Sequence, residues 1–177
     1  MIQKIIFAGF GGQGVLFSAK TLAYAGMDAD MQISWLPSYG PEMRGGTANC
    51  SVILSDAPIG SPVINQPDVL IAMNKPSLEK FVDTVVPGGV IVLDSFLIDT
   101  KVKRDDVTVV YIPAKQLAEE AGNGSLGNMV MLGAALKHRD LIAPEKVYDS
   151  MAEHTPKSKV ALVELNKKMI ELGYNFQ

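Results

Sequence analysis

The residues best suited to chemistry form a glycine-rich segment near the start of the chain. GFGGQG has the spacing G-x-G-x-x-G at Gly9, Gly11 and Gly14, between an apolar run and a helical pattern. Glycine permits positive φ and lets the backbone approach a pyrophosphate, whose charge is attracted by the free N–H groups at a helix start. We therefore predict an anion-binding loop; the alternative is a tight strand-to-helix turn that contacts no ligand.

Two common nucleotide sites do not fit the residues around this loop. A dinucleotide site adds an Asp or Glu at the end of the second strand, about 20 residues beyond the loop. That place holds Trp35, Leu36 and Pro37, which disfavours NAD. Nucleotide hydrolysis of the Walker type is excluded because Gln13 stands where a phosphate-binding lysine would be needed and no G-K-[ST] follows.

A second cluster of candidate binding residues lies in the segment SYGPEMRGG. Its Gly and Pro content predicts a loop, with the preceding strand ending at Pro37. Tyr39, Glu42 and Arg44 offer an aromatic face, a carboxylate and a guanidinium whose geometry matches phosphate. The alternative is a rigid surface loop in which Glu42 and Arg44 pair in solvent, and such a pair contributes little to stability.

The remaining polar candidates are isolated. Asn128 lies at the start of a helical segment, where it caps the helix or binds a ligand, and capping is the favoured interpretation. His138 and His154 have no metal-ligand spacing to another His or Cys, so we expect both to be solvated residues at helix ends. Cys50, in the middle of a strand, is expected to be buried as a small apolar residue.

The hydrophobic pattern predicts strands that alternate with helices, which is typical of a doubly wound sheet. We expect one α/β domain over residues 1–177, with a Rossmann-like, mostly parallel sheet, helices on both faces and a helix-rich C-terminal part. The predicted strands span residues 3–8, 32–35, 47–54, 68–73, 90–94 and 107–112, and the predicted helices span 15–26, 77–85, 114–121, 126–138, 144–153 and 157–172.

Composition limits the classes of partner and location. Of the 177 residues, 47% are hydrophobic and 20% are charged, and the net charge of −3 comes without a stripe of Lys or Arg, which argues against nucleic acid. The sequence contains neither a signal peptide nor an apolar run of the roughly 18 residues that span a bilayer, so we expect a cytoplasmic protein without a membrane partner. The single cysteine cannot supply the four thiolates of an iron–sulfur cluster.

The chain contains, in this order, the motifs GFGGQG, SYGPEMRGG, TANCSVILSDAPIGSP and LGNMVMLGA. With these motifs it resembles the gamma subunit of 2-oxoacid:ferredoxin oxidoreductases. The resemblance covers essentially the whole chain and includes PDVLIAMNKPSLEKF. It implies a complex that converts a 2-oxoacid and coenzyme A to acyl-coenzyme A and carbon dioxide, with ferredoxin as the electron acceptor. The form of SYGPEMRGG is more similar to the 2-oxoglutarate and branched-chain types than to the pyruvate type.

The resemblance also implies how work is divided among subunits. Alpha and beta subunits, with a ferredoxin-like delta subunit as a further candidate, would hold thiamine diphosphate, magnesium and the iron–sulfur clusters, and this chain would have no catalytic residue or metal ligand of its own. Coenzyme A would contact the following residues of this chain: Gly9, Gly11, Gly12, Gln13, Gly14, Tyr39, Glu42, Arg44 and Asn128. Two alternatives stay open: a stand-alone nucleotide-binding module, and an assembly subunit whose glycine motifs only shape an interface.

Overall fold

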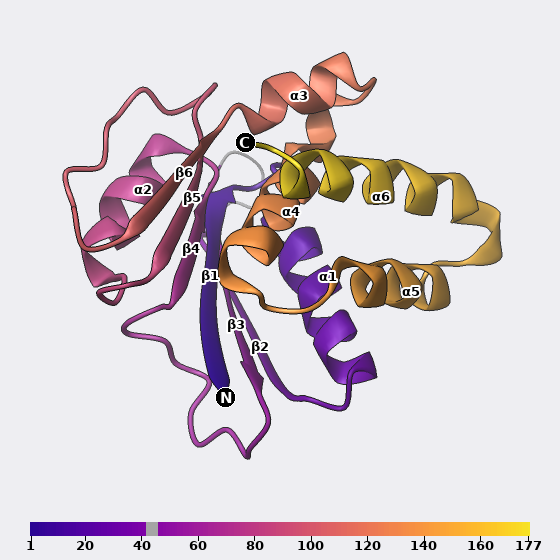
Figure 1. Ribbon diagram of the computed structural model, residues 1–177, viewed down its shortest axis with the longest axis horizontal. Helices are drawn as coiled ribbons and strands as arrows, with labels where there is room; N and C mark the ends of the chain where they lie inside the picture. Colours follow the sequence, from indigo (N-terminus) through magenta and orange to yellow (C-terminus); the bar gives the residue numbers. More distant parts are fainter. Residues whose placement is uncertain (42–45) are drawn as a thin grey trace.

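A computed structural model describes residues 1–41 and 46–177, which form a six-stranded sheet with helices on both faces (Figure 1). The strand order is β2-β3-β1-β4-β5-β6, and β3 is antiparallel to both of its neighbours. The pairs β1–β4, β4–β5 and β5–β6 are parallel. The strands are β1 (Ile2–Phe10), β2 (Gln32–Tyr39), β3 (Thr47–Ser55), β4 (Val69–Ala72), β5 (Val90–Asp94) and β6 (Thr108–Ile112).

The helices cover the two faces of the sheet unequally. Figure 1 shows α2 on one face and α1, α4, α5 and α6 on the other. Because side chains alternate along a strand, Ile5 and Phe7 of β1 enter the larger core, and Ile6 and Ala8 enter the smaller core under α2. The helices are α1 (Val15–Asp28), α2 (Lys75–Phe81), α3 (Ala114–Glu120), α4 (Gly127–Arg139), α5 (Pro144–His154) and α6 (Val160–Tyr174), with short 3₁₀ turns η1 (Val82–Thr84), η2 (Gly124–Leu126) and η3 (Lys157–Lys159).

This architecture confirms the predicted fold class, a mostly parallel α/β sheet with a helix-rich C-terminal part. The four residues of β4 and the five of β5 are all buried, as expected for parallel strands covered on both faces. In the described part of the chain, no helix has both the length and the apolar composition that crossing a membrane requires.

The second strand is longer than its sequence predicts. We expected it to end at Pro37, but β2 continues through this proline to Tyr39, where it still pairs with Ala48 of β3. Proline cannot donate a ladder hydrogen bond, so it is tolerated in a strand only where one side of the strand is unpaired. That condition holds here because β2 is an edge strand, a property that depends on the order of the whole sheet.

The two histidines differ in their surroundings. His138 is exposed in the last turn of α4, as predicted, and partial burial with Lys137 nearby lowers its pKa. His154 is not simply solvated: its Nε2 lies 3.0 Å from a carboxylate oxygen of Asp28, and its ring stacks on Tyr24 with 4.3 Å between centroids. Residues 126 positions apart thereby join α5 to α1, a contact that no local sequence pattern reveals.

Candidate functional site

The glycine loop joins the end of β1 to the start of α1, and its glycines have different structural roles. Gly9 is buried, and a Cβ there would lie 3.0 Å from Met73 Cβ, which is tighter than an ordinary contact. Gly12 and Gly14 have φ of +97° and +75°, a region that side chains disfavour. Nothing lies near a Cβ placed on Gly12, so this exposed residue leaves the loop open to a ligand.

The side chain of Gln13 holds the loop in place. Its Oε1 accepts a 2.7 Å hydrogen bond from the Phe10 N–H and a 3.3 Å hydrogen bond from Asn74 Nδ2. Its Nε2 donates to the carbonyl of Met73 at 3.1 Å. These partners tie the end of β1 to the end of β4, so the amide of Gln13 positions the loop and has little capacity left for a ligand.

The loop presents backbone donors at the start of a 14-residue helix. The N–H groups of Gly12, Gly14 and Val15 have no hydrogen-bond partner among the residues that the structure describes. Gly11 differs, because its N–H donates to the carbonyl of Gly46 at 2.8 Å. Free N–H groups at a helix N-terminus are the usual way in which a protein binds a phosphate through its backbone.

Asn128 supports the loop from the opposite side, although it is 114 residues away in sequence. Its Nδ2 donates to the carbonyl of Gly14 at 3.0 Å, while its Oδ1 has no partner within residues 1–41 and 46–177. The favoured prediction for Asn128 was capping of its own helix, and this is wrong: the N-cap position of α4 is Leu126, and no side chain caps it. The amide of Asn128, only 4% exposed, turns to the glycine loop instead.

A hollow of about 500 Å³ opens beside the loop, at the carboxyl ends of β1, β4 and β5. Its walls include Gly12, Lys75, Asp94, Lys115 and Asn128, and we call it the charged hollow. β1 is followed by a helix on one face of the sheet and β4 by a helix on the other. Ligands of open α/β sheets bind at such a switch point, because the loops diverge there and leave a crevice.

In the described part of the chain, two lysines and one carboxyl group line the charged hollow. Lys75 Nζ lies 3.5 Å from Asp99 and Lys115 Nζ lies 3.8 Å from Glu119, both in solvent-exposed pairs that hold the lysines weakly. Burial raises the pKa of Asp94, although its oxygens accept hydrogen bonds from the N–H groups of Phe96 and Lys115 at 3.0 and 3.1 Å. Asp94 therefore has a structural role, while the lysine side chains remain available to an anion.

A second hollow, also of about 500 Å³, lies on the other side of the loop. It is lined by Phe10, Gly12, Gly14, Phe17 and Tyr39, and we call it the apolar hollow. Both hollows share Phe10 and Gly12 in their walls, so the glycine loop separates a charged region from an apolar one. A ligand with an anionic part and a less polar extension matches this arrangement.

The structure brings several predicted site residues together and shows others that the sequence analysis missed. The glycine loop, Asn128 and Tyr39 all border one of the two hollows, whereas Glu42 and Arg44 lie outside the described residues. Lys75 and Lys115 were missed. Lys75 follows β4 and Lys115 follows β6, each within three residues, and lysines at the carboxyl ends of parallel strands were the signal available in the sequence.

The fold and the site together define a Rossmann-like α/β domain with a glycine loop between its first strand and first helix. The sequence model of the family described as pyruvate ferredoxin/flavodoxin oxidoreductase matches residues 4–176, and the chain belongs to this family.

Relatives and solved structures agree with this family. The chain is 37% identical over 170 residues to the ketoisovalerate oxidoreductase subunit VorA of Methanothermobacter marburgensis, covering 96% of this chain but only 35% of that relative. It is 34% identical to the 2-oxoglutarate synthase subunit KorC of Methanocaldococcus jannaschii, covering 89% and 86% of the two chains. The keto/oxoacid ferredoxin oxidoreductase gamma subunit of Geobacter sulfurreducens superposes with a TM-score of 0.81 at 28% identity, covering 97% and 96%.

A further structure shares the fold. The 2-oxoglutarate:ferredoxin oxidoreductase of Magnetococcus marinus, described with 2-oxoglutarate, coenzyme A and succinyl-CoA bound, gives a TM-score of 0.77 at 24% identity. The match covers 99% of this chain and 32% of that one. The fold of this chain therefore also forms part of a longer oxidoreductase polypeptide.

Proposed function

We propose that this chain is the gamma subunit of a 2-oxoacid:ferredoxin oxidoreductase, with residues 1–177 as one gamma-type domain that contributes to the coenzyme A site. The complex converts a 2-oxoacid and coenzyme A to acyl-coenzyme A and carbon dioxide and passes the electrons to ferredoxin. Family membership and the names of the relatives support this proposal. The working location is the cytoplasm, where acyl-coenzyme A is made and consumed.

The observation that carries the coenzyme A proposal is the glycine loop between the charged and apolar hollows. Coenzyme A has a diphosphate, a separate 3′-phosphate and a long, less polar pantetheine arm. The free N–H groups of Gly12, Gly14 and Val15 would bind the diphosphate. The apolar hollow beside Tyr39 would take the pantetheine arm. Coenzyme A is also present in the Magnetococcus marinus oxidoreductase that shares this fold.

The proposed contacts of the predicted site residues now divide into two kinds. Gly11, Gly12, Gly14 and Tyr39 would touch the ligand or the space it occupies, with Glu42 and Arg44 from the adjoining loop. The following three residues would act indirectly: Gly9 by close packing, and Gln13 and Asn128 by hydrogen bonds that hold the loop.

Partner subunits are required by the chemistry of the reaction. Oxidative decarboxylation of a 2-oxoacid needs thiamine diphosphate with magnesium, and the two electrons need iron–sulfur clusters on their way to ferredoxin. Cys50 is the one cysteine of the chain, and it is buried in β3. Cysteine-ligated clusters need about four thiolates, so alpha and beta subunits, and a ferredoxin-like delta subunit where the complex has one, would hold these groups.

We further propose that the substrate is 2-oxoglutarate or a branched-chain 2-oxoacid. The form of SYGPEMRGG supports this choice, and so do the names of two relatives, a 2-oxoglutarate synthase subunit and a ketoisovalerate oxidoreductase subunit. The 2-oxoacid itself would bind on the partner subunits, next to thiamine diphosphate.

The proposal is tested by isolating the chain from its native host without oxygen, through an affinity tag, and assaying reduction of a viologen dye. We expect larger, cluster-bearing chains to co-purify and the dye to be reduced only with a 2-oxoacid and coenzyme A together. Pyruvate, 2-oxoglutarate and 2-oxoisovalerate in parallel assays identify the substrate. A chain that elutes alone and without activity would contradict the subunit role and favour the stand-alone nucleotide-binding module.

The other alternative is an assembly subunit that contacts no ligand. The kinetics of the complex distinguish this role from the proposed coenzyme A-binding role. A Gly12→Ala variant places a methyl group on the open face of the loop, where no other group limits it; alanine is used because the positive φ of Gly12 strains a β-branched residue more. We expect the apparent Michaelis constant for coenzyme A to rise at least tenfold while thiamine diphosphate content stays the same. An unchanged constant would favour the assembly role.

A further inference from the structure

We propose that Lys75 and Lys115 form a second anion subsite in the charged hollow, separate from the glycine loop, and that it binds the 3′-phosphate of coenzyme A. This inference rests on the proposed coenzyme A site. Gly12, whose N–H has no partner among the described residues, lines both hollows, while the two lysines line the charged hollow alone, so the two groups of donors lie at different places. A ligand with two well-separated phosphate groups fits such a site better than one with a single phosphate.

Both lysines are anchored to the glycine loop through their neighbours in sequence. Lys75 opens α2 directly after Asn74, whose Nδ2 donates to Gln13 of the loop at 3.3 Å and whose Oδ1 accepts from the Ser77 N–H at 2.9 Å. Asn74 is buried, so this link is shielded from water. The start of α2, and with it Lys75, is therefore held at a defined place relative to the loop.

Lys115 is held by the other side of the hollow. Its backbone N–H donates to Asp94 at the end of β5, and a Cβ added to Gly127 would lie only 3.2 Å from its backbone nitrogen. Gly127 is followed by Asn128, which donates to the Gly14 carbonyl. The backbone of Lys115 thus packs against the same α4 start that supports the loop, which fixes the origin of its side chain.

The electrostatic balance of the hollow favours a second anion. Among the wall residues that the structure describes, Lys75 and Lys115 are the cationic side chains, and Asp94 is the acidic one. The oxygens of Asp94 are directed to backbone N–H groups, and burial of this carboxyl disfavours its charged form. The exposed partners of the two lysines, at 3.5 and 3.8 Å, are beyond the distance of a good charge-assisted hydrogen bond. A phosphate monoester that enters the hollow would compete with these weak partners for the ammonium groups.

The inference predicts discrimination between coenzyme A and 3′-dephospho-coenzyme A, which differ only in that phosphate. We would titrate each compound into the full-length, isotope-labelled chain, up to millimolar concentration, and follow backbone amide resonances by NMR. Coenzyme A is expected to shift the amides of the glycine loop and those around Lys75 and Lys115. The dephospho compound is expected to shift the loop alone and to bind about tenfold more weakly, since one charge-assisted contact is worth roughly that factor.

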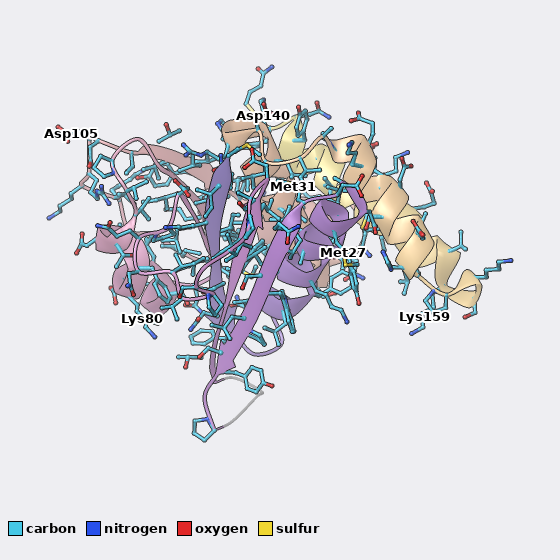
Figure 2. All side chains as sticks on the ribbon, turned by 90° about the horizontal axis from the view of Figure 1, so that it is seen from below. Met27, Met31, Lys80, Asp105, Asp140 and Lys159 are labelled. Carbon is cyan, nitrogen blue, oxygen red and sulfur yellow. The ribbon has the colours of Figure 1, made fainter. Side chains whose placement is uncertain are left out.

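Lysine variants make the test specific. Lys75→Ala and Lys115→Ala should each weaken binding of coenzyme A several-fold and leave binding of the dephospho compound unchanged. Lys80→Ala is the matched control, because Lys80 lies on the same helix α2 with its Nζ 5.1 Å from the Phe81 ring, away from the hollow. Lys159→Ala is a second control, because Lys159 is not among the residues that line the charged hollow. Figure 2 shows Lys159 at the end of the molecule opposite Lys80. Both controls should bind the two compounds as the unmodified chain does.

The possible failures are distinguishable. Equal affinity for the two compounds, with shifts confined to the glycine loop, would overturn the second subsite and leave the proposed coenzyme A site in place. Shifts from neither compound would overturn both. Equal losses in the Lys75, Lys115, Lys80 and Lys159 variants would show that the lysines act only through net charge, which also overturns the subsite. The amide spectrum of each variant without ligand reports whether it is folded.

Discussion

Alanine substitution at Gly12 and Gly14 separates two structural demands on the glycine loop. Both residues have positive φ, a conformation that costs a non-glycine residue about 1–2 kcal/mol. A Cβ at Gly12 would meet nothing, so Gly12→Ala should cost about 1–2 kcal/mol of stability and no more. A Cβ at Gly14 would overlap the amide group of Asn128, which is buried and donates to the Gly14 carbonyl.

Gly14→Ala should therefore carry an additional cost. Displacing the Asn128 amide breaks its hydrogen bond and leaves buried polar groups unpaired, which costs about 1–3 kcal/mol. The total expected for Gly14→Ala is about 2–5 kcal/mol, against about 1–2 for Gly12→Ala. Urea unfolding followed by circular dichroism measures both, provided that the slope with denaturant is the same for all variants.

The double variant Gly14→Ala/Asn128→Ala tests the cause of the difference. Removing the Asn128 amide removes the overlap, so Gly14→Ala should cost less in the Asn128→Ala background than in the unmodified chain. Two results would refute this reasoning: equal stability losses for the two glycine variants, or additive effects of Gly14→Ala and Asn128→Ala.

Three further predictions follow from particular contacts. Gly173→Ala should destabilise the fold by about 1–3 kcal/mol, because a Cβ there would overlap the α4 backbone. Gly60→Ala is the control, since a Cβ at Gly60 would lie in open space and should have little effect. Equal melting temperatures of the two variants would contradict the close packing of α4 and α6. Hydrogen bonds lower the pKa of Asp28, so its contribution to stability is present above the unfolded pKa of 3.8 and is lost as the pH falls through the lower, folded pKa. The stability gap between the unmodified chain and Asp28→Asn in urea unfolding should therefore be constant at neutral pH and narrow as the pH falls below 3.8, and a gap that does not change with pH would contradict this. Burial raises the pKa of Cys50 to about 12, so the folded chain holds little of the reactive thiolate. A disulfide reagent at pH 8 should therefore modify this thiol only after unfolding by denaturant. Immediate modification of the folded chain would show that the thiol is accessible.

Local sequence patterns were sufficient for most of the secondary structure. Strands such as β4 and β5 are short apolar runs in the sequence. Gly, Pro and charged residues on either side of each run favour turns, so they mark where the strand ends. Likewise, Pro144 predicts the start of α5, since proline fits the first position of a helix, where no N–H is needed. Of the three glycines in the G-x-G-x-x-G spacing, Gly14 has the positive φ that a residue without a Cβ adopts easily, and Gly12, outside that spacing, has a positive φ as well.

Other features depended on contacts between distant parts of the chain. The extension of β2 through Pro37 is possible because β3 inserts between β2 and β1 and leaves β2 at the edge. This insertion also makes an antiparallel strand, β3, the neighbour of β1 on that side, so β2 is not directly beside β1 as the strand that carries the acidic residue of a dinucleotide site would be. Neither consequence is visible in a window of neighbouring residues, because strand order is set by the packing of the whole sheet.

The sequence by itself determined the class of fold, the family and the presence of a glycine-rich turn between a strand and a helix, because backbone conformation and hydrophobic period are properties of short segments. Only the tertiary structure decided which side chains surround that loop. Asn128 turned from its own helix to Gly14, and Lys75 and Lys115 met in one hollow, because the carboxyl ends of parallel strands gather at one edge of the sheet. A binding site is built from residues that are distant in sequence, and their proximity exists only once the chain has folded.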